Sequence, residues 1–181
     1  MNTPPASMKK QIIIRYLSLA LLTGIFTTRV SAQASVTANM FAEIIAALTA
    51  TEQSQLGFGK FSPGTNGGEI HLSPQGVRSV SGNVMLSGGG HSAGSFIITG
   101  EDQATFSIAL PSGQSVLINS SGTKTMLVTS WESEPAPGTG VGVLNGGTQE
   151  VKVGATLLVG AMSDNPVGIY TGTYIITFAY N

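Results

Sequence analysis

Residues 173–180 have the sequence Thr-Tyr-Ile-Ile-Thr-Phe-Ala-Tyr. In an extended chain, successive side chains point to opposite faces. One face of this stretch therefore carries the large side chains Tyr174, Ile176, Phe178 and Tyr180, and the other carries Thr173, Ile175, Thr177 and Ala179. β-Branched and aromatic residues in this alternation are typical of a strand that covers a core with one face. The stretch predicts a β-strand and a fold built from sheets.

The same alternation recurs along the chain in short runs separated by turn residues. Glycine, asparagine and proline favour turns because they allow a positive φ or fix φ, and they cluster between the runs, as in Asn66-Gly67-Gly68 and Asp164-Asn165-Pro166. The runs predict strands at Glu69–Leu72, Val80–Ser87, Gly94–Thr99, Thr105–Leu110, Ser115–Asn119, Met126–Glu132, Gly147–Val153 and Ala155–Val159. Many short strands at intervals of about 8–12 residues predict an all-β, antiparallel sandwich or barrel.

Two stretches fit this pattern less well. As a helix, Met40–Leu48 would gather its large apolar residues on one side, whereas a strand that begins at Val36 would alternate apolar with polar residues. We favour the strand because a lone helix at the edge of this pattern has no partner to pack against. Residues 133–143 are rich in proline and glycine, which fit a central strand poorly, and they predict a long exposed loop.

The first 34 residues predict a secretory signal peptide. A positive region with Lys10 and Arg15 precedes the apolar run Tyr16–Phe26, and small residues permit cleavage after Ala32 or Ala34. The uncharged run after Arg15 has only 13 residues, whereas a helix that spans a membrane needs about 20. We therefore expect a protein exported to the periplasm or the cell surface, and not an integral membrane protein.

Removal of the leader leaves one predicted domain, residues 35–181, which is large enough for a single hydrophobic core. This part has four basic and nine acidic residues, a net charge of −5, which argues against nucleic acid as a partner. The chain has no cysteine, so an exported fold must be stable without disulfides. Charged residues make up only 9% of the chain and glycines number 24, a composition that fits a β protein with many turns.

The residues predict no metal site, no cofactor and no enzyme. His71 and His91 are the only histidines, and without cysteine they leave a metal too few ligands. A catalytic triad would have to draw on these two histidines and on two aspartates. His71 alternates with Ile70 and Leu72, so we expect it on the solvent face of a strand.

The remaining candidate residues have simple structural explanations. Glu101-Asp102 and the Glu132/Glu134 pair lie next to turn residues, where we expect them to be solvated. Gly88-Gly89-Gly90 is not followed by the Lys-Ser/Thr of a phosphate-binding loop, so it predicts a turn. Trp131, the only tryptophan, is expected to anchor the core, with a stacking platform for a sugar as the alternative.

Several motifs together resemble a family of secreted bacterial single-domain proteins of unknown function, which are similar to subunits of chaperone–usher pili. The resemblance covers most of residues 35–181. Its motifs are Leu56-Gly57-Phe58-Gly59, Gly100 after the Phe-Ile-Ile-Thr strand, Phe106-Ser107-Ile108-Ala109-Leu110-Pro111, Val153-Gly154-Ala155-Thr156-Leu157 and Gly168-Ile169-Tyr170-Thr171-Gly172-Thr173-Tyr174.

The C-terminus also resembles that of pilus subunits, which have a penultimate tyrosine and a glycine fourteen places from the end. Tyr180 and Gly168 hold these positions. The resemblance implies an immunoglobulin-like sandwich that lacks its final strand, a periplasmic chaperone that pairs with the last strand, and an outer-membrane usher. The chain departs from the pilus pattern in having no disulfide pair and only a short N-terminal extension.

A sandwich without its final strand exposes unpaired backbone groups and an apolar groove, which another chain can cover. The predicted donor is Ser35–Ile44, with Val36, Ala38, Met40 and Ile44 directed into the groove, and the acceptor includes Tyr174, Ile176 and Phe178. The alternative is that residues 35–50 form the first strand of a complete sandwich.

These observations predict a fimbria-like structural subunit that associates with itself by strand donation and serves adhesion or biofilm cohesion. The alternative is a self-complete sandwich that binds a glycan or surface polymer through its loops, with residues 133–143 and Trp131 as the candidate site.

Overall fold

A computed structural model describes residues 10–11 and 32–181, in two parts divided after Ala42. The predicted signal peptide lies outside the described residues except for Lys10, Gln11 and Ala32–Ala34. Residues 32–48 form neither helix nor strand, so neither structure expected for Met40–Leu48 is present. Among the described residues there is no helix of the length and apolar character that crossing a membrane requires.

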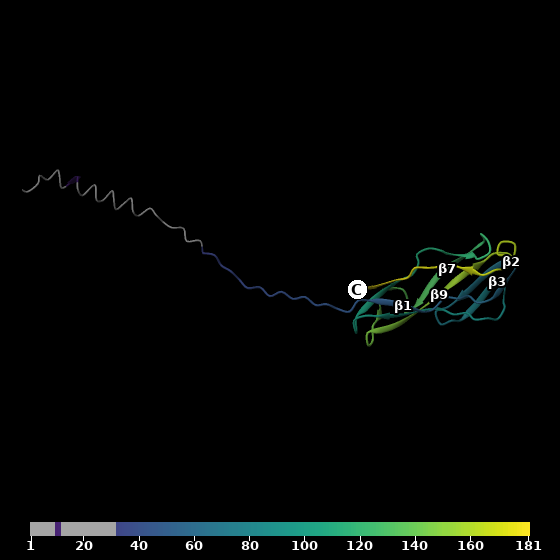
Figure 1. Cartoon of the computed structure of the whole chain (residues 1–181), viewed down its shortest axis with the longest axis horizontal. Coiled ribbons are helices and arrows are strands. Elements are labelled where there is room, and N and C mark those ends of the chain that lie inside the picture. Colours follow the sequence, from purple (N-terminus) through teal and green to yellow (C-terminus); the bar gives the residue numbers. More distant parts are fainter. Residues whose placement is uncertain (1–9, 12–31) are drawn as a thin grey trace, which may run out of the picture. The chain divides into compact units, whose positions relative to one another are not determined.

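The second part, residues 43–181, is an all-β domain (Figure 1). Turn residues separate strands whose apolar positions recur with a period of two, as the alternation predicts. The strands are β1 (Thr49–Ser54), β2 (Phe61–Leu72), β3 (Arg78–Leu86), β4 (Gly94–Thr99), β5 (Thr105–Ala109), β6 (Ser115–Asn119), β7 (Thr125–Glu134), β8 (Gly138–Val143), β9 (Thr148–Val159), β10 (Tyr170–Thr171) and β11 (Thr177–Tyr180).

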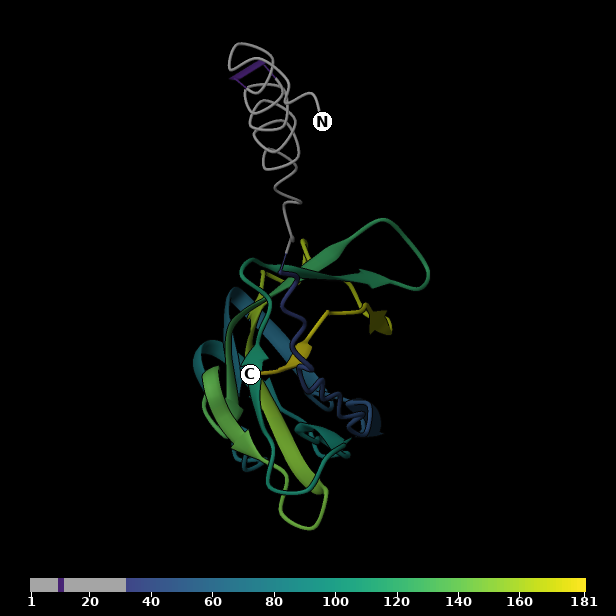
Figure 2. The same cartoon turned by 90° about the vertical axis from the view of Figure 1, so that its left-hand side faces the viewer.

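The strands form two antiparallel sheets, so the predicted β-sandwich is confirmed. The larger sheet has eight strands in the order β1-β4-β9-β7-β6-β10, with β2 paired to β9 and to β3. The smaller sheet has three strands in the order β11-β5-β8. Figure 2 looks along the domain and shows the last segment of the chain, in yellow, beside the residues that lead into β1, in dark blue.

Strand β9 is the centre of the larger sheet. Its first half pairs with β4 and its second half with β2, while β7 pairs along its other edge. The sequence pattern divides this strand at Gly154, but the strand is continuous there. Gly154 is required because a Cβ at this position would collide with the Leu72 carbonyl oxygen.

The core consists of two clusters of buried apolar side chains. One cluster lies under β2, β7 and β9 and includes Ile70, Leu72 and Leu157. The other lies between the two sheets and includes Ile98 of β4 and Phe106 of β5. The predicted alternation is confirmed in β5 and at the end of β2, where buried apolar residues occupy every second position.

The prediction of a long loop at residues 133–143 is wrong. Strand β7 continues to Glu134, and after Pro135 the chain returns as β8, which pairs with β5. Glycine is tolerated in β8 because the Phe106 ring packs against the backbone of Gly142 and leaves no room for a side chain.

We predict that Gly142→Ala lowers the free energy of unfolding by about 1–3 kcal/mol, because the new methyl group overpacks against the buried Phe106 ring. Urea unfolding measures the change. Gly113→Ala is the matched control, since no atom lies within 4 Å of its added methyl group. Equal stability of the two variants would contradict the close packing of β8 on Phe106.

Candidate functional site

Strand β1 lies at an edge of the larger sheet and is not covered by the smaller one. Ala50 pairs with Ile98 and Glu52 pairs with Phe96, so these four side chains point to the same side of the sheet. Ile98 is fully buried on that side, whereas every residue from Thr49 to Gln53 is exposed. Among the described residues, therefore, no layer packs against the inward face of β1.

The C-terminal residues 174–180 are also incompletely covered. Tyr174, Ile176, Phe178 and Tyr180 point inward as predicted, but each is only half-buried. Residues 177–180 pair with β5 on one side, and in the described part of the chain no strand pairs with their other side. Residues 172–176 belong to no strand, so the predicted strand Thr173–Tyr180 is correct only for its second half, β11. Residues 173–176 lead into β11 with the same alternation of exposed and half-buried side chains.

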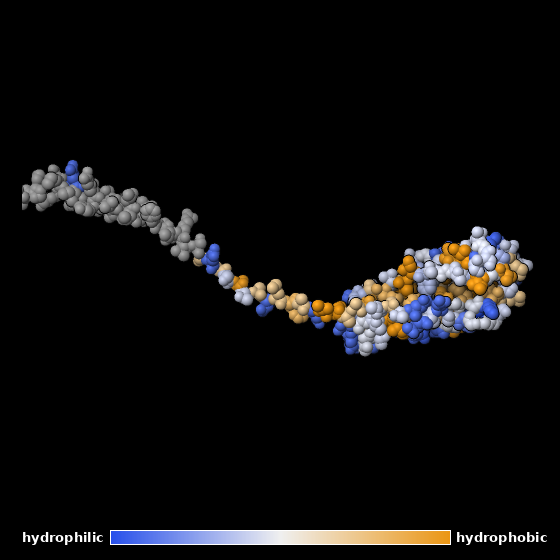
Figure 3. Space-filling view, viewed as in Figure 1, coloured by the Kyte–Doolittle hydropathy of each residue, from blue (hydrophilic) through white to orange (hydrophobic). Residues whose placement is uncertain are grey.

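These two uncovered edges lie on the same side of the sandwich. The Phe96 ring of β4 lies 6.0 Å from the Phe178 ring and 6.3 Å from the Tyr174 ring. Leu48, just before β1, packs against the same buried cluster as Phe178 and Tyr180. We call the surface between the edges the open strip, and its residues are Ala50, Glu52, Phe96, Tyr174, Ile176 and Phe178. Figure 3 shows apolar residues along the length of the domain.

Tyr174 brings a polar atom into this apolar surface. Its hydroxyl is buried against Gly94 and has no hydrogen-bond partner in the described part of the chain. Burial, with a smaller contribution from the Glu52 carboxylate, raises the pKa of Tyr174 to about 12. The hydroxyl therefore stays protonated over the physiological range, and its missing hydrogen bond costs stability.

Tyr180 holds the point at which the chain enters the domain. Its hydroxyl donates to the Ala46 carbonyl oxygen (2.9 Å) and accepts from the Glu101 N–H (2.7 Å). The Ala46 N–H donates to the Glu101 carboxylate (3.0 Å). We call these three hydrogen bonds the Ala46 clamp. They fix the origin of the preceding segment at the end of the domain where β11 ends.

The predicted donor residues are exposed. Val36 and Met40, in the part before Glu43, expose 92% and 98% of their surface, and Ala38 is exposed as well. Ile44, at the start of the domain, is 98% exposed. A run of apolar side chains in contact with water is costly and is typical of a segment that binds another surface.

Trp131 points inward and packs on the core, as expected for an anchor. The irregular pairing of β7 near Ser130, which has a φ of 49°, shifts the alternation so that Trp131 and Ser133 face the core. The indole ring lies 4.7 Å from the Tyr174 ring, and its N–H donates to the Gly113 carbonyl oxygen (3.3 Å). Trp131 therefore adjoins the open strip, and its polar atom is already used.

Gly168 lies apart from the open strip. It packs against the Asn119 side chain, whose nearest atom would be 2.5 Å from an added Cβ. Asn119 is buried, and its side-chain oxygen accepts from the Ser121 N–H. Gly168 thus belongs to the loop before β10, whereas the other C-terminal residues of the predicted acceptor lie together.

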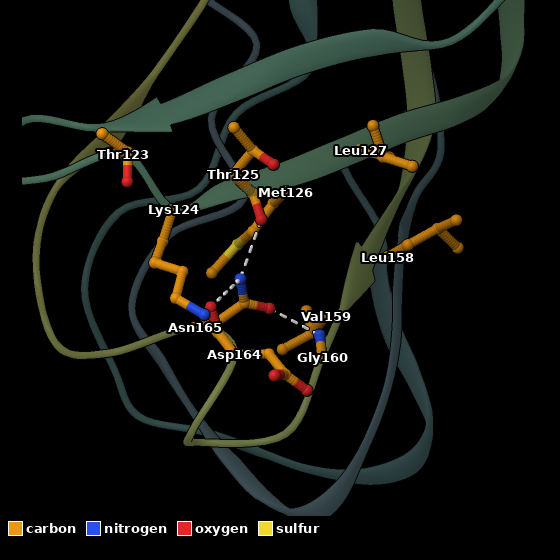
Figure 4. Close-up of a pocket in the computed structure, with 10 residues that line it drawn as sticks. All are labelled: Thr123, Lys124, Thr125, Met126, Leu127, Leu158, Val159, Gly160, Asp164 and Asn165. Carbon is orange, nitrogen blue, oxygen red and sulfur yellow. Dashed lines mark hydrogen bonds between the residues drawn. The ribbon is translucent and has the colours of Figure 1, made fainter.

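Two cavities elsewhere are shaped by structural residues. The first, of about 510 Å³, is lined by Lys124, Asp164 and Asn165 among others (Figure 4). The Asn165 side chain accepts from the Gly160 N–H and donates to the Thr125 carbonyl oxygen, so it closes a loop. The second, of about 570 Å³, lies beside Trp131 and Pro137. Within residues 10–11 and 32–181, no group of three or more His, Asp or Glu side chains could hold a metal.

The exposed histidine and carboxylates make local contacts. His71 is in β2 between two buried residues, as predicted, and its ring contacts Glu132 (3.2 Å) and the Thr156 hydroxyl (3.3 Å) on the outer face of the sheet. Hydrogen bonds from Gln103 and from two glycine N–H groups hold the pKa of Asp102 below its usual range. These contacts stabilise strands and turns.

Gly90-His91-Ser92-Ala93-Gly94 has the Gly-x-Ser-x-Gly spacing of a nucleophile elbow, in which the serine lies on a turn from a strand to a helix. Ser92 instead forms a β-bridge with Gly57, and its hydroxyl donates to the Gln55 carbonyl oxygen (2.7 Å). No helix follows in the described structure. The motif is therefore part of a glycine-rich connection.

The sequence pattern identified one side of the open strip and missed the other. Phe96 alternates with Ile98 in a predicted strand and could have been proposed as a partner of the last strand. Ala50 and Glu52 could not, because only the pairing of β1 with β4 shows which of their faces points inward. The Ala46 clamp joins residues that are distant in the sequence, so no local sequence pattern predicts it.

We predict that Tyr174→Phe raises the free energy of unfolding of the monomer by about 1 kcal/mol, because it removes a buried hydroxyl without a partner. Tyr170→Phe is the control and should be destabilising, since the Tyr170 hydroxyl donates to the Pro166 carbonyl oxygen (2.9 Å). Urea unfolding compares the two. A loss of stability in Tyr174→Phe equal to that of the control would show that the hydroxyl has a partner.

A pH dependence follows from the raised pKa of Tyr174. Between pH 10 and about 12 the unfolded chain loses this proton and the folded chain keeps it, so stability should fall as the pH rises through this range. Tyr174→Phe should remove that part of the fall. Unfolding curves of both proteins at several alkaline pH values measure it, and identical slopes would contradict the assignment.

The comparisons with known proteins give one result. No curated protein and no solved structure matches the chain. The family described as a domain of unknown function (DUF4402) matches residues 48–180, which is most of the chain and nearly the whole of the β-domain. The protein therefore belongs to the DUF4402 family, and its β-sandwich is a DUF4402 domain.

Proposed function

We propose that the protein is an exported structural subunit whose copies assemble when residues 35–44 of one copy cover the open strip of the next. The observation that supports this most directly is the exposed inward face of β1 beside a half-buried last strand. An added strand would pair with the backbone of residues 172–180 and bury the apolar side chains of both partners. Such polymers would serve adhesion or biofilm cohesion.

The sequence favours donation between copies over closure within one copy. To cover its own strip beside β1, the segment would have to form a hairpin near Ala46. Residues 40–55 contain no glycine, proline, asparagine or aspartate, the residues that tight hairpin turns need. The Ala46 clamp adds to this, because it holds the backbone at the position where the turn would form.

During export, the apolar segment and the open strip must be kept from binding to other copies too early. An apolar segment and an open strip on every copy would associate indiscriminately. A periplasmic chaperone that covers the last strand, and an usher in the outer membrane, fit this need, and both form part of the proposal.

The first test is the thermal resistance of the assembled protein. Native and recombinant mature protein is run on a denaturing gel with and without boiling, and unboiled material is imaged by negative stain. We expect a ladder of oligomers that disappears on boiling, together with filaments. A single monomer band and no filaments from either source would contradict assembly by strand donation.

Deletion of residues 35–44 should abolish the ladder and leave the domain folded, because these residues make no strand. Circular dichroism and urea unfolding check the fold. As a matched control, the deleted segment is added after Asn181 through an Asn-Gly turn, so that it can return along β11. This variant should be a monomer of higher stability. A ladder that persists after the deletion would exclude the segment as donor.

A further inference from the structure

We propose a specific alignment for the donated segment: it lies antiparallel to residues 172–180 of a second copy, with Ala38 beside Phe178, Met40 beside Ile176 and Ala42 beside Tyr174. Phe41, on the outer face, lies beside Ile175. This alignment rests on the proposed strand donation and adds the features that select one arrangement of the two chains.

The first feature is an alternation of side-chain size on both partners. Along the inner face of residues 172–180, the aromatic residues Tyr174 and Phe178 flank the smaller Ile176. Along the apolar face of the segment, the small residues Ala38 and Ala42 flank the large Met40. Packing is densest where large side chains meet small ones. The proposed alignment makes this match at all three positions.

A shift of two residues in either direction destroys the match. Met40 would then lie beside an aromatic ring, and an alanine would lie beside Ile176. The first contact is overpacked and the second leaves a void, and each is destabilising. A shift of one residue is excluded because it would turn the apolar face of the segment outward.

A shift of four residues that places Met40 beside Gly172 keeps the size match. The side chains on the outer face distinguish this shifted alignment from the proposed one. Ile175, just before β11, is 80% exposed, and Phe41 is 87% exposed in its own part of the chain. In the proposed alignment these two side chains are direct cross-strand neighbours and cover each other, a favourable aromatic–aliphatic pair. After a shift of four, Phe41 would lie beside Thr171 and Ile175 beside Thr37.

The antiparallel direction fits an open chain of copies. The Ala46 clamp lies at the Tyr180 end of each domain. If the donated segment is antiparallel, it leaves the acceptor domain near Gly172, at the end of the strip away from the acceptor's own Ala46 clamp. The acceptor's own segment is then free to bind a third copy, and an open chain forms. A parallel segment would leave beside the acceptor's own Tyr180, and two copies would then close into a pair. The described sheets contain only antiparallel pairs.

The absence of cysteine from the whole chain permits a direct test by disulfide formation. Neighbouring residues on adjacent antiparallel strands have Cα atoms about 4.5–5.5 Å apart, within the range that a disulfide spans. The double variant Glu43→Cys with Thr173→Cys reports the proposed alignment. Glu43→Cys with Ile169→Cys reports the shift of four, and Glu43→Cys with Ala179→Cys reports a parallel segment.

After mild oxidation, we expect the Thr173 variant alone to give a ladder that survives boiling and collapses on reduction. A covalent ladder from either of the other two variants, or from none of the three while the unmodified protein still polymerises, would overturn the alignment and leave strand donation standing. If the unmodified protein forms no heat-sensitive ladder, the proposed function itself fails.

A second measurement uses the side-chain sizes. Ala42→Leu should weaken polymerisation about tenfold or more, since a larger side chain would meet the Tyr174 ring. Met40→Leu, which nearly conserves volume, should have little effect. Both changes lie outside the strands, so the domain folds in each. Equal effects of the two variants would contradict the pairing of small with large residues.

Discussion

The sandwich is constrained by the unequal width of its two sheets. Three strands face eight, and a sheet of three strands cannot cover the inner face of one so much wider. Part of the difference is made up within the larger sheet, where β2 and β3 extend beyond β9 and form a core of their own with β7. β4 and β1 continue the sheet from the same edge of β9, beside the first half of that strand. There the described residues add no further layer, and β1 remains uncovered. The open strip is therefore a property of the topology and does not depend on any single side chain.

The residues around the open strip partly compensate for the missing cover over β1. Tyr174 and Phe178 each pack against Phe96 and provide part of the missing layer. Trp131 packs against Tyr174 and against the core cluster of β2, β7 and β9. The buried hydroxyl of Tyr174 is a local cost of this arrangement. Hydrogen bonds in the Ala46 clamp secure the other end of the strip, where the backbone of the entering chain would otherwise be loose.

The sequence predicts the strands that have a clear local alternation of side chains. It does not predict the strands that form only because of their pairing with distant residues. Strands β4 and β6 have the predicted bounds because their alternation is clear and turn residues flank them. Strand β8 was missed because Gly142 is acceptable in a strand only where the Phe106 ring packs against it, a contact that no local pattern reveals. Strand β1 was missed because its residues are mostly small or polar. The inner face of the last strand was predicted correctly, since it repeats large residues at every second position.

The composition of residues 32–48 affects how the chain behaves before it assembles. They contain no proline or glycine, only one charged residue, Glu43, and a majority of apolar side chains exposed to water. Segments of this composition stack readily with identical segments into cross-β aggregates. The feature that suits the segment for ordered pairing with a folded neighbour thus also allows a competing, disordered outcome. Which of the two prevails is a kinetic question, set by how long each newly exported chain waits with this segment uncovered.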